Sequence, residues 1–147
     1  LSQMCLHYTL IPDQLLDQAI NLLFTGLNKF FDDLYDLIIE TLPHLLKRNA
    51  NKNNELFEKH FALLKEKDTE QIFSSLIILL CLPNIPSNDL DALMQILIQS
   101  IENKNTDKYI KEKTILLLSA LWPSFALENR TRVFEVMSAQ LKEDKPM

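Results

Sequence analysis

The chain has 147 residues, of which 47% are hydrophobic and 24% are charged, and its net charge is −5 at pH 7. This length and apolar content predict a folded chain with a sizeable core and exclude intrinsic disorder. The acidic balance argues against nucleic acid as a partner, because phosphate binding needs clustered Lys and Arg. Gly occurs once, Val is rare, and Leu and Ile are abundant. The fold class predicted from this composition is all-α, without a phosphate-binding loop.

Cysteine content and the absence of targeting signals bear on location. The two cysteines, Cys5 and Cys81, are too few for a disulfide framework in a chain of this length, so a reducing compartment fits. No stretch reaches 18 apolar residues and no secretory signal opens the chain, so we expect no membrane span and an intracellular location, cytoplasmic or nuclear. Because the sequence begins at Leu1 and not at Met, we also expect it to be a fragment of a longer protein.

Apolar residues in the first third of the chain recur with helical spacing. Residues 1–10 carry Leu1, Met4, Cys5 and Tyr8 at i, i+3, i+4 and i+7, which predicts the end of a preceding helix. Helices are then predicted over 12–25, 31–42 and 44–47, with Gly26 as a C-cap. The Asn- and Lys-rich segment 49–54 is predicted to be a solvent-exposed loop.

The remaining two-thirds of the chain continue the same pattern. Asp68 and Gln71 have the spacing of a capping box, and the run 72–82 that follows is apolar on nearly every side, so we expect neighbours to cover it all round. Residues 103–106 are predicted to form a polar loop, and residues 143–147 a frayed tail. The helices predicted here span 55–65, 68–82, 89–102, 107–121 and 128–142.

Prolines indicate a repeat. Pro43, Pro83 and Pro123 are 40 residues apart, and each follows an apolar run that a helix would end. A period of about 40 residues is typical of two-helix solenoid repeats. We therefore predict a single helical-repeat domain over 1–147. Its parts are the end of a preceding helix at 1–10, repeats at 11–48, 54–83 and 86–123, and the first helix of a further repeat at 127–142.

The segment 107–118 gives the clearest family resemblance. Its order of an Asp, an aliphatic residue, a basic residue and a small-and-aliphatic run resembles the second helix of a HEAT repeat. Asp107 would cap the helix, Ile110 and Leu117 would pack inward, and Lys111 would take the basic position. The resemblance to the HEAT and armadillo-like family covers about residues 12–141. It implies a right-handed stack of antiparallel helix pairs whose members serve as scaffolds, transport receptors or adaptors.

The predicted function is therefore a non-enzymatic scaffold or adaptor segment. It would bind another protein through the surface formed by the second helices of the repeats. No catalytic residue, cofactor site or metal site is predicted. The residues expected to contact the partner are Asp33, Asp36, Glu40, Lys108, Lys111 and Glu112.

Single residues also allow other interpretations. Asp32, Asp33, Asp36 and Glu40 have carboxylates suited to a divalent cation or to acid–base catalysis, although the Gly of a calcium loop is missing. Cys5 and His7 are a weak metal pair, whereas His60 on an apolar stripe predicts a partly buried core or groove residue. Trp122 predicts packing in the core or between repeats. Two alternatives for the whole chain remain: a nucleic-acid-binding or DNA-repair enzyme on a HEAT-like scaffold, and a compact helical-bundle signalling decoy.

Overall fold

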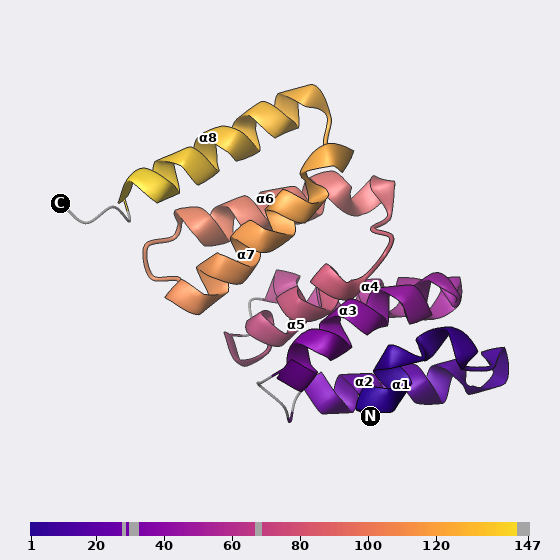
Figure 1. Cartoon of the computed structure of the whole chain (residues 1–147). Coiled ribbons are helices and arrows are strands. Elements are labelled where there is room, and N and C mark those ends of the chain that lie inside the picture. Colours follow the sequence, from indigo (N-terminus) through magenta and orange to yellow (C-terminus); the bar gives the residue numbers. More distant parts are fainter. Residues whose placement is uncertain (28, 30–32, 67–68, 144–147) are drawn as a thin grey trace. The chain divides into compact units, whose positions relative to one another are not determined.

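The computed structural model describes residues 1–27, 29, 33–66 and 69–143, with the backbone alone at 33, 69, 70 and 143. This part of the chain is helical throughout and contains no strand, so the predicted all-α class is confirmed (Figure 1). None of the described helices is long and apolar enough to cross a membrane. The helices are α1 (Ser2–Leu6), α2 (Leu16–Leu27), α3 (Asp33–Lys47), α4 (Ala50–Glu66), α5 (Thr69–Cys81), α6 (Leu90–Glu102), α7 (Lys108–Leu121) and α8 (Leu127–Glu143), with 3-10 turns η1 (Tyr8–Leu10), η2 (Asp13–Leu15), η3 (Ser87–Asp89) and η4 (Trp122–Ser124).

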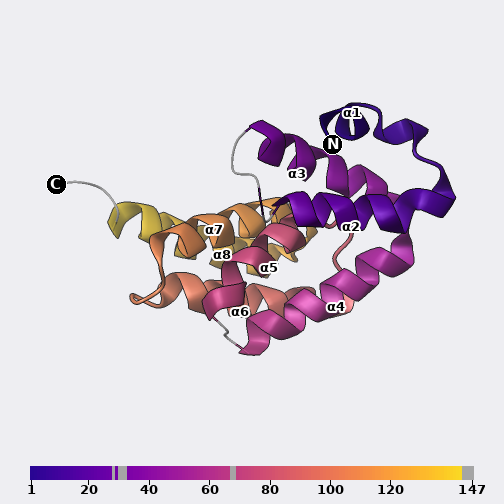
Figure 2. The same cartoon turned by 90° about the horizontal axis from the view of Figure 1, so that it is seen from below.

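Two compact units divide the chain. The first comprises Leu1–Glu58 and Cys81–Ile85, and the second comprises Lys59–Leu80 and Pro86–Met147. In the first unit α3 packs against both α2 and α1, as the view in Figure 2 shows. Its core is aliphatic because each helix turns one stripe of Leu and Ile inward. The most deeply buried side chains there are Ile20, Leu23, Ile38, Leu42, Leu45 and Leu46, all 0% exposed.

Polar contacts of Arg48 fasten the chain segment before α2 to the end of α3. The guanidinium donates to the carbonyls of Tyr8 and Ile11 and to the carboxylate of Asp13, at 3.3, 2.5 and 2.8 Å. The ring of Tyr8 stacks on that of His44 with centroids 4.7 Å apart. The carbonyl of Ile11 thus gains a side-chain donor, and the carbonyl of Tyr8, which already accepts from the N–H of Ile11, gains a second one.

In the second unit α6 contacts both α7 and α8. The loop 103–107 turns the chain back, so α6 and α7 form a hairpin, and η4 leads into α8 (Figure 1). Asp107 accepts a hydrogen bond from the backbone N–H of Tyr109 at 2.8 Å, which confirms the predicted N-cap. The side chains of α6, α7 and α8 that are at most 1% exposed are Leu93, Met94, Leu97, Ile98, Ile101, Thr114, Leu117, Leu118 and Val133.

Two of the sequence predictions about helix ends were wrong. The helix predicted to end before Pro43 continues as α3 to Lys47, with Pro43 inside it. Proline removes one helical hydrogen bond, but Leu45 and Leu46 beyond it are fully buried, and tertiary packing outweighs that local loss. The predicted loop 49–54 is instead the first turn of α4. The Asn49 side chain accepts from the N–H of Lys52 at 3.1 Å and caps the helix.

Smaller departures concern α2 and α5. Gly26 lies inside α2, one residue before its end, and is buried. The predicted capping residue Asp68 lies outside the described residues. Phe73 of α5 keeps 36% of its surface exposed beside the exposed Ser74, so α5 is not covered all round as predicted. The predicted helices 89–102, 107–121 and 128–142 agree with α6, α7 and α8 to within a residue at each end.

Candidate functional site

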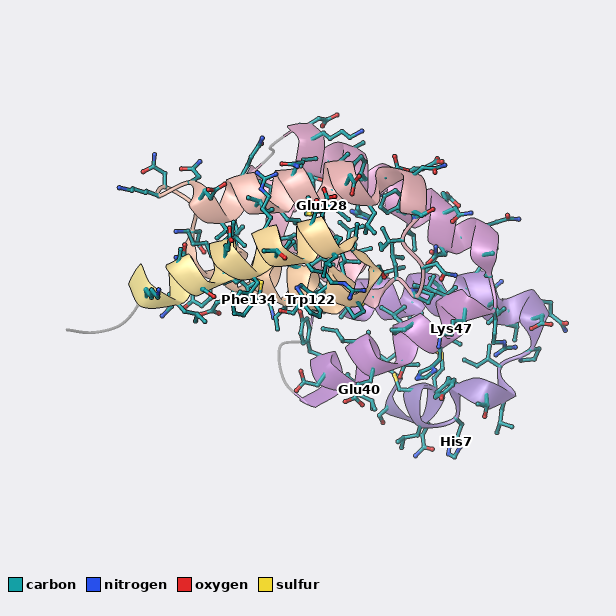
Figure 3. The ribbon with its side chains drawn as sticks, turned by 90° about the horizontal axis from the view of Figure 1, so that it is seen from above. His7, Glu40, Lys47, Trp122, Glu128 and Phe134 are labelled. Atoms are coloured by element: carbon teal, nitrogen blue, oxygen red, sulfur yellow. The ribbon has the colours of Figure 1, made fainter. Side chains whose placement is uncertain are left out.

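The acidic residues predicted to bind a partner belong to α3 of the first unit. Asp36 and Glu40 are both exposed and, four residues apart, lie on the same face of the helix. Figure 3 labels Glu40 on α3. Ile38 and Leu42 on the inward side are fully buried, which fixes the rotation of the helix and keeps the two carboxylates in solvent. The backbone of Asp33 begins α3, and its side chain lies outside the described part of the structure, as does Asp32.

The basic end of the predicted surface belongs to α7 of the second unit. Lys108 and Glu112 are exposed and Lys111 is half-buried, all within the first turns after the Asp107 cap. Leu117, in the following turns, is 1% exposed and anchors the helix in the unit's core. The structure therefore brings the three α7 residues together on one helix end.

Two apolar residues share the exposed side of α7, and sequence reasoning missed them. Tyr109 and Leu116 are 67% and 50% exposed, and their spacing of seven places them one above the other. Glu112 lies between them on this side of the helix. Leu116 stands in the apolar run 115–118 and Tyr109 beside Ile110, where periodicity alone does not separate the outward stripe from the inward one. We call Lys108, Tyr109, Glu112 and Leu116 the α7 face; Lys111, two residues after Tyr109, lies on another side of the helix.

A second exposed aromatic group sits where α7 passes into α8. Trp122 was predicted to pack in the core or between repeats; 39% of its surface is exposed, so the core position was wrong, and packing between repeats stays a prediction. Its indole N–H donates to the carbonyl of Arg130 at 3.2 Å, and the Arg130 guanidinium lies 5.2 Å from the ring centroid. Arg130 in turn donates to the carbonyls of Phe125 and Pro123 at 3.0 and 2.7 Å. The indole stays at the surface because this network holds it there.

On α8 itself, an apolar stripe faces outward. Leu127, Phe134 and Leu141 are 76%, 65% and 67% exposed and are spaced by seven residues. Val133 and Gln140, 0% and 6% exposed, take the inward side. Figure 3 labels Glu128, Trp122 and Phe134 in this part of the second unit. We call Leu127, Phe134 and Leu141 the α8 stripe.

A cavity of about 590 Å³ opens between α4, α5, α6 and α7 of the second unit. Apolar side chains form one part of its wall, and the residues at the end of α6 and in the following loop form a polar rim. Asp107, the charged residue of this lining, already caps α7. The lining includes Leu64, Leu76, Leu97, Ile110, Asn103 and Thr106.

The pair that comes nearest to a nucleophile and its base is buried. The Nδ1 atom of His60 lies 3.1 Å from the Oγ atom of Ser75, and the two residues are 6% and 0% exposed. Burial, with a smaller contribution from the nearby charge of Lys59, lowers the pKa of His60 to about 4. The prediction of a core histidine is confirmed. Because neither atom reaches the surface, this geometry suits packing and not attack on a substrate.

The cysteines behave as core residues. Cys5 is 2% exposed whereas His7 is exposed, and burial raises the pKa of Cys81 to about 12. Among residues 1–27, 29, 33–66 and 69–143, no group of three or more His, Cys, Asp or Glu side chains is arranged to hold a metal ion.

Searches of family models, of curated proteins and of solved structures found no match to this chain.

Proposed function

We propose that the chain is a non-enzymatic protein-interaction segment that binds another protein through the α7 face. The single observation that carries the proposal is the exposure of Tyr109 and Leu116 on the same side of α7 as Lys108 and Glu112. Protein interfaces combine an apolar or aromatic centre with a charged rim, and Tyr is frequent among the residues that contribute most to binding. Contact with a partner gives a physical reason for an exposed Tyr and an exposed Leu two turns apart on one helix face, whereas contact with water alone gives none.

A HEAT-like arrangement of the helices is part of the same proposal. Two observations support it: α6 and α7 form a hairpin, and α6 also contacts α8, as the first helices of successive repeats do in a stack. In such a stack the second helices of the repeats carry the binding surface. On this assignment α3 and α7 are both second helices, and each presents charged residues to solvent.

Asp36 and Glu40 are proposed as a second contact, on α3. Two like charges one turn apart destabilise a helix by about 0.2–0.5 kcal/mol. A basic group of the partner would remove that repulsion, so the pair fits a partner with both an apolar and a basic part. This preference for a basic group also fits the chain's net charge of −5.

The experiment compares proteins captured by the wild-type chain with those captured by three double variants. Tyr109→Ser with Leu116→Ser should reduce capture of the specific partner at least about ten-fold, as loss of central interface residues does. Asp36→Lys with Glu40→Lys should weaken it, whereas Leu10→Ser with Leu22→Ser is the control, because both leucines are exposed in the first unit. The four apolar side chains are half or more exposed, and both carboxylates are exposed. Melting temperatures should therefore stay nearly unchanged. A partner retained equally by all four proteins contradicts the proposal.

A further inference from the structure

The α8 stripe has a pattern that the α7 face does not have. Leu127, Phe134 and Leu141 are each separated by seven residues, so they form a nearly straight line along the helix. The small residues Thr131 and Ser138 fill the alternate positions of the same line. Apolar or small residues that recur at alternating intervals of four and three form the seam of a coiled coil. Such a seam packs against a second helix.

The seam is nearly symmetric about its midpoint, Phe134. When two α8 helices lie antiparallel about Phe134, Leu127 of one copy faces the partner's Leu141, and the two Phe134 rings meet at the centre. By the two-fold symmetry, Leu141 of the first copy faces the partner's Leu127. Self-complementarity of one patch is what a two-fold interface requires.

Charges beside the seam support the same pairing. Glu128, Glu135 and Lys142 are exposed on one edge of the stripe. In the antiparallel pair Glu128 lies near the partner's Lys142, and symmetry makes this contact twice. Only the central Glu135 meets its own copy. Two opposite-charge contacts therefore compete with one like-charge contact, and edge charges of this kind select partner and orientation.

A parallel pair would instead direct Glu135 toward the partner's Arg130. That guanidinium is already held by the carbonyls of Phe125 and Pro123 and lies over the ring of Trp122. Breaking these contacts to reach a new carboxylate would leave two carbonyls without their donor. The antiparallel orientation needs no such change.

We propose that the α8 stripe is a self-association surface through which two copies of this chain pair antiparallel about Phe134. This use of α8 is additional to the proposed binding of a partner by the α7 face. The helix has 17 residues and is about 25 Å long. Stable interfaces bury about 800 Å² on each partner, so a contact along one helix face belongs to the weak class, in the micromolar range.

Sedimentation of the 147-residue chain over about 10 μM to 1 mM tests the association. We expect a concentration-dependent monomer–dimer equilibrium. Phe134→Glu should raise the dimer dissociation constant at least about ten-fold. Leu22→Glu, a change of another half-exposed apolar residue in the first unit, is the control and should not alter the dissociation constant. A wild-type chain that remains monomeric at the highest concentration, or an unchanged equilibrium in Phe134→Glu, overturns the proposal.

Orientation is tested by two further changes. Glu135→Gln should tighten the antiparallel dimer by a few-fold because it removes the central repulsion, whereas a parallel dimer would weaken. Oxidised Phe134→Cys should cross-link, and Leu127→Cys should not, since its antiparallel counterpart is Leu141. Wild type serves as the background control, because Cys5 and Cys81 are both buried. Equal cross-linking of the two variants would contradict the antiparallel arrangement.

Discussion

His60 and Ser75 show how a polar pair is accommodated in an apolar core. Each satisfies the other at 3.1 Å, so burying them leaves no unpaired group of the kind that costs about 1–3 kcal/mol. The histidine is neutral in the folded state because burial lowers its pKa from 6.5 to about 4. Protonation at acid pH therefore opposes folding.

We predict that the free energy of unfolding decreases as the pH is lowered, because of His60. Its folded pKa is below its unfolded value of 6.5, so the unfolded chain binds the proton more readily. The contribution of the neutral histidine to the free energy of unfolding is fully present above pH 6.5. It decreases as pH falls below that value and stops changing below about pH 4. Between pH 7 and pH 5 the loss is about 2 kcal/mol. Urea unfolding at both pH values should show it in wild type and not in His60→Gln; equal losses in the two proteins would contradict the account.

Arg48 is the residue whose contacts hold the amino-terminal turns of the first unit. Arg48→Met should cost about 1–2 kcal/mol of unfolding free energy, because the carbonyl of Ile11 and the carboxylate of Asp13 lose the Arg48 donor and the carbonyl of Tyr8 keeps only the N–H of Ile11. Asp13→Asn removes only the ion pair with an 87% exposed carboxylate and should cost less than about 0.5 kcal/mol. Denaturant titration of both variants checks the order, and a larger effect in Asp13→Asn would show that the ion pair, and not the carbonyl contacts, stabilises this segment.

At this scale the sequence predicted residues whose environment is set by local pattern. His60 on its apolar stripe, Cys81 in its apolar run and Asp107 before its helix are examples. Ser75 could not be assigned, because a hydroxyl within an apolar run indicates no partner until another helix supplies one. The core position considered for Trp122 was wrong for a related reason. Hydrophobicity predicts burial, but its exposed position depends on the carbonyl of Arg130, eight residues later.

At the scale of elements, Pro43 in α3 separates local preference from packing. Proline in a helix interior costs up to about 3 kcal/mol relative to Ala, partly offset by the freedom it removes from the unfolded chain. Pro43→Ala should therefore stabilise the chain by about 1–2 kcal/mol. Pro123 is in the first turn of η4, where no helical N–H is needed, so Pro123→Ala is the control and should change stability by less than about 0.5 kcal/mol. Thermal and urea unfolding measure both, and a destabilised Pro43→Ala would show that the proline has a packing role.

Helices bounded by strong signals were predicted closely, and those without them were not. Asp107 at the start of α7 and the polar residues 103–106 before it mark a clear boundary. The Asn-rich segment 49–54 looked like a loop because Asn has a low helix propensity. In the structure Asn49 caps α4, and Asn53 is 2% exposed with its amide donating to the carbonyl of Asn84 at 3.0 Å. That carbonyl is 31 residues away, beyond the reach of a local pattern.

At the scale of the molecule, the all-α class followed from composition, and the site followed only in part. Charge and spacing directed attention to Asp36 and Glu40 on α3 and to Lys108, Lys111 and Glu112 on α7. The apolar residues that accompany them, Tyr109 and Leu116, became visible only when the inward stripe of α7 was fixed by contact with α6. The period of 40 residues and the HEAT-like stack remain predictions that explain why such faces would be exposed.

The most direct measurement of the central claim is the dissociation constant between the purified chain and the captured partner, determined by calorimetry. The account predicts that Tyr109→Ser with Leu116→Ser weakens binding at least about ten-fold while the melting temperature stays within about 2 °C of wild type. Leu10→Ser with Leu22→Ser should bind as wild type does. An unchanged dissociation constant in the α7 variant would contradict the claim that this helix carries the binding surface.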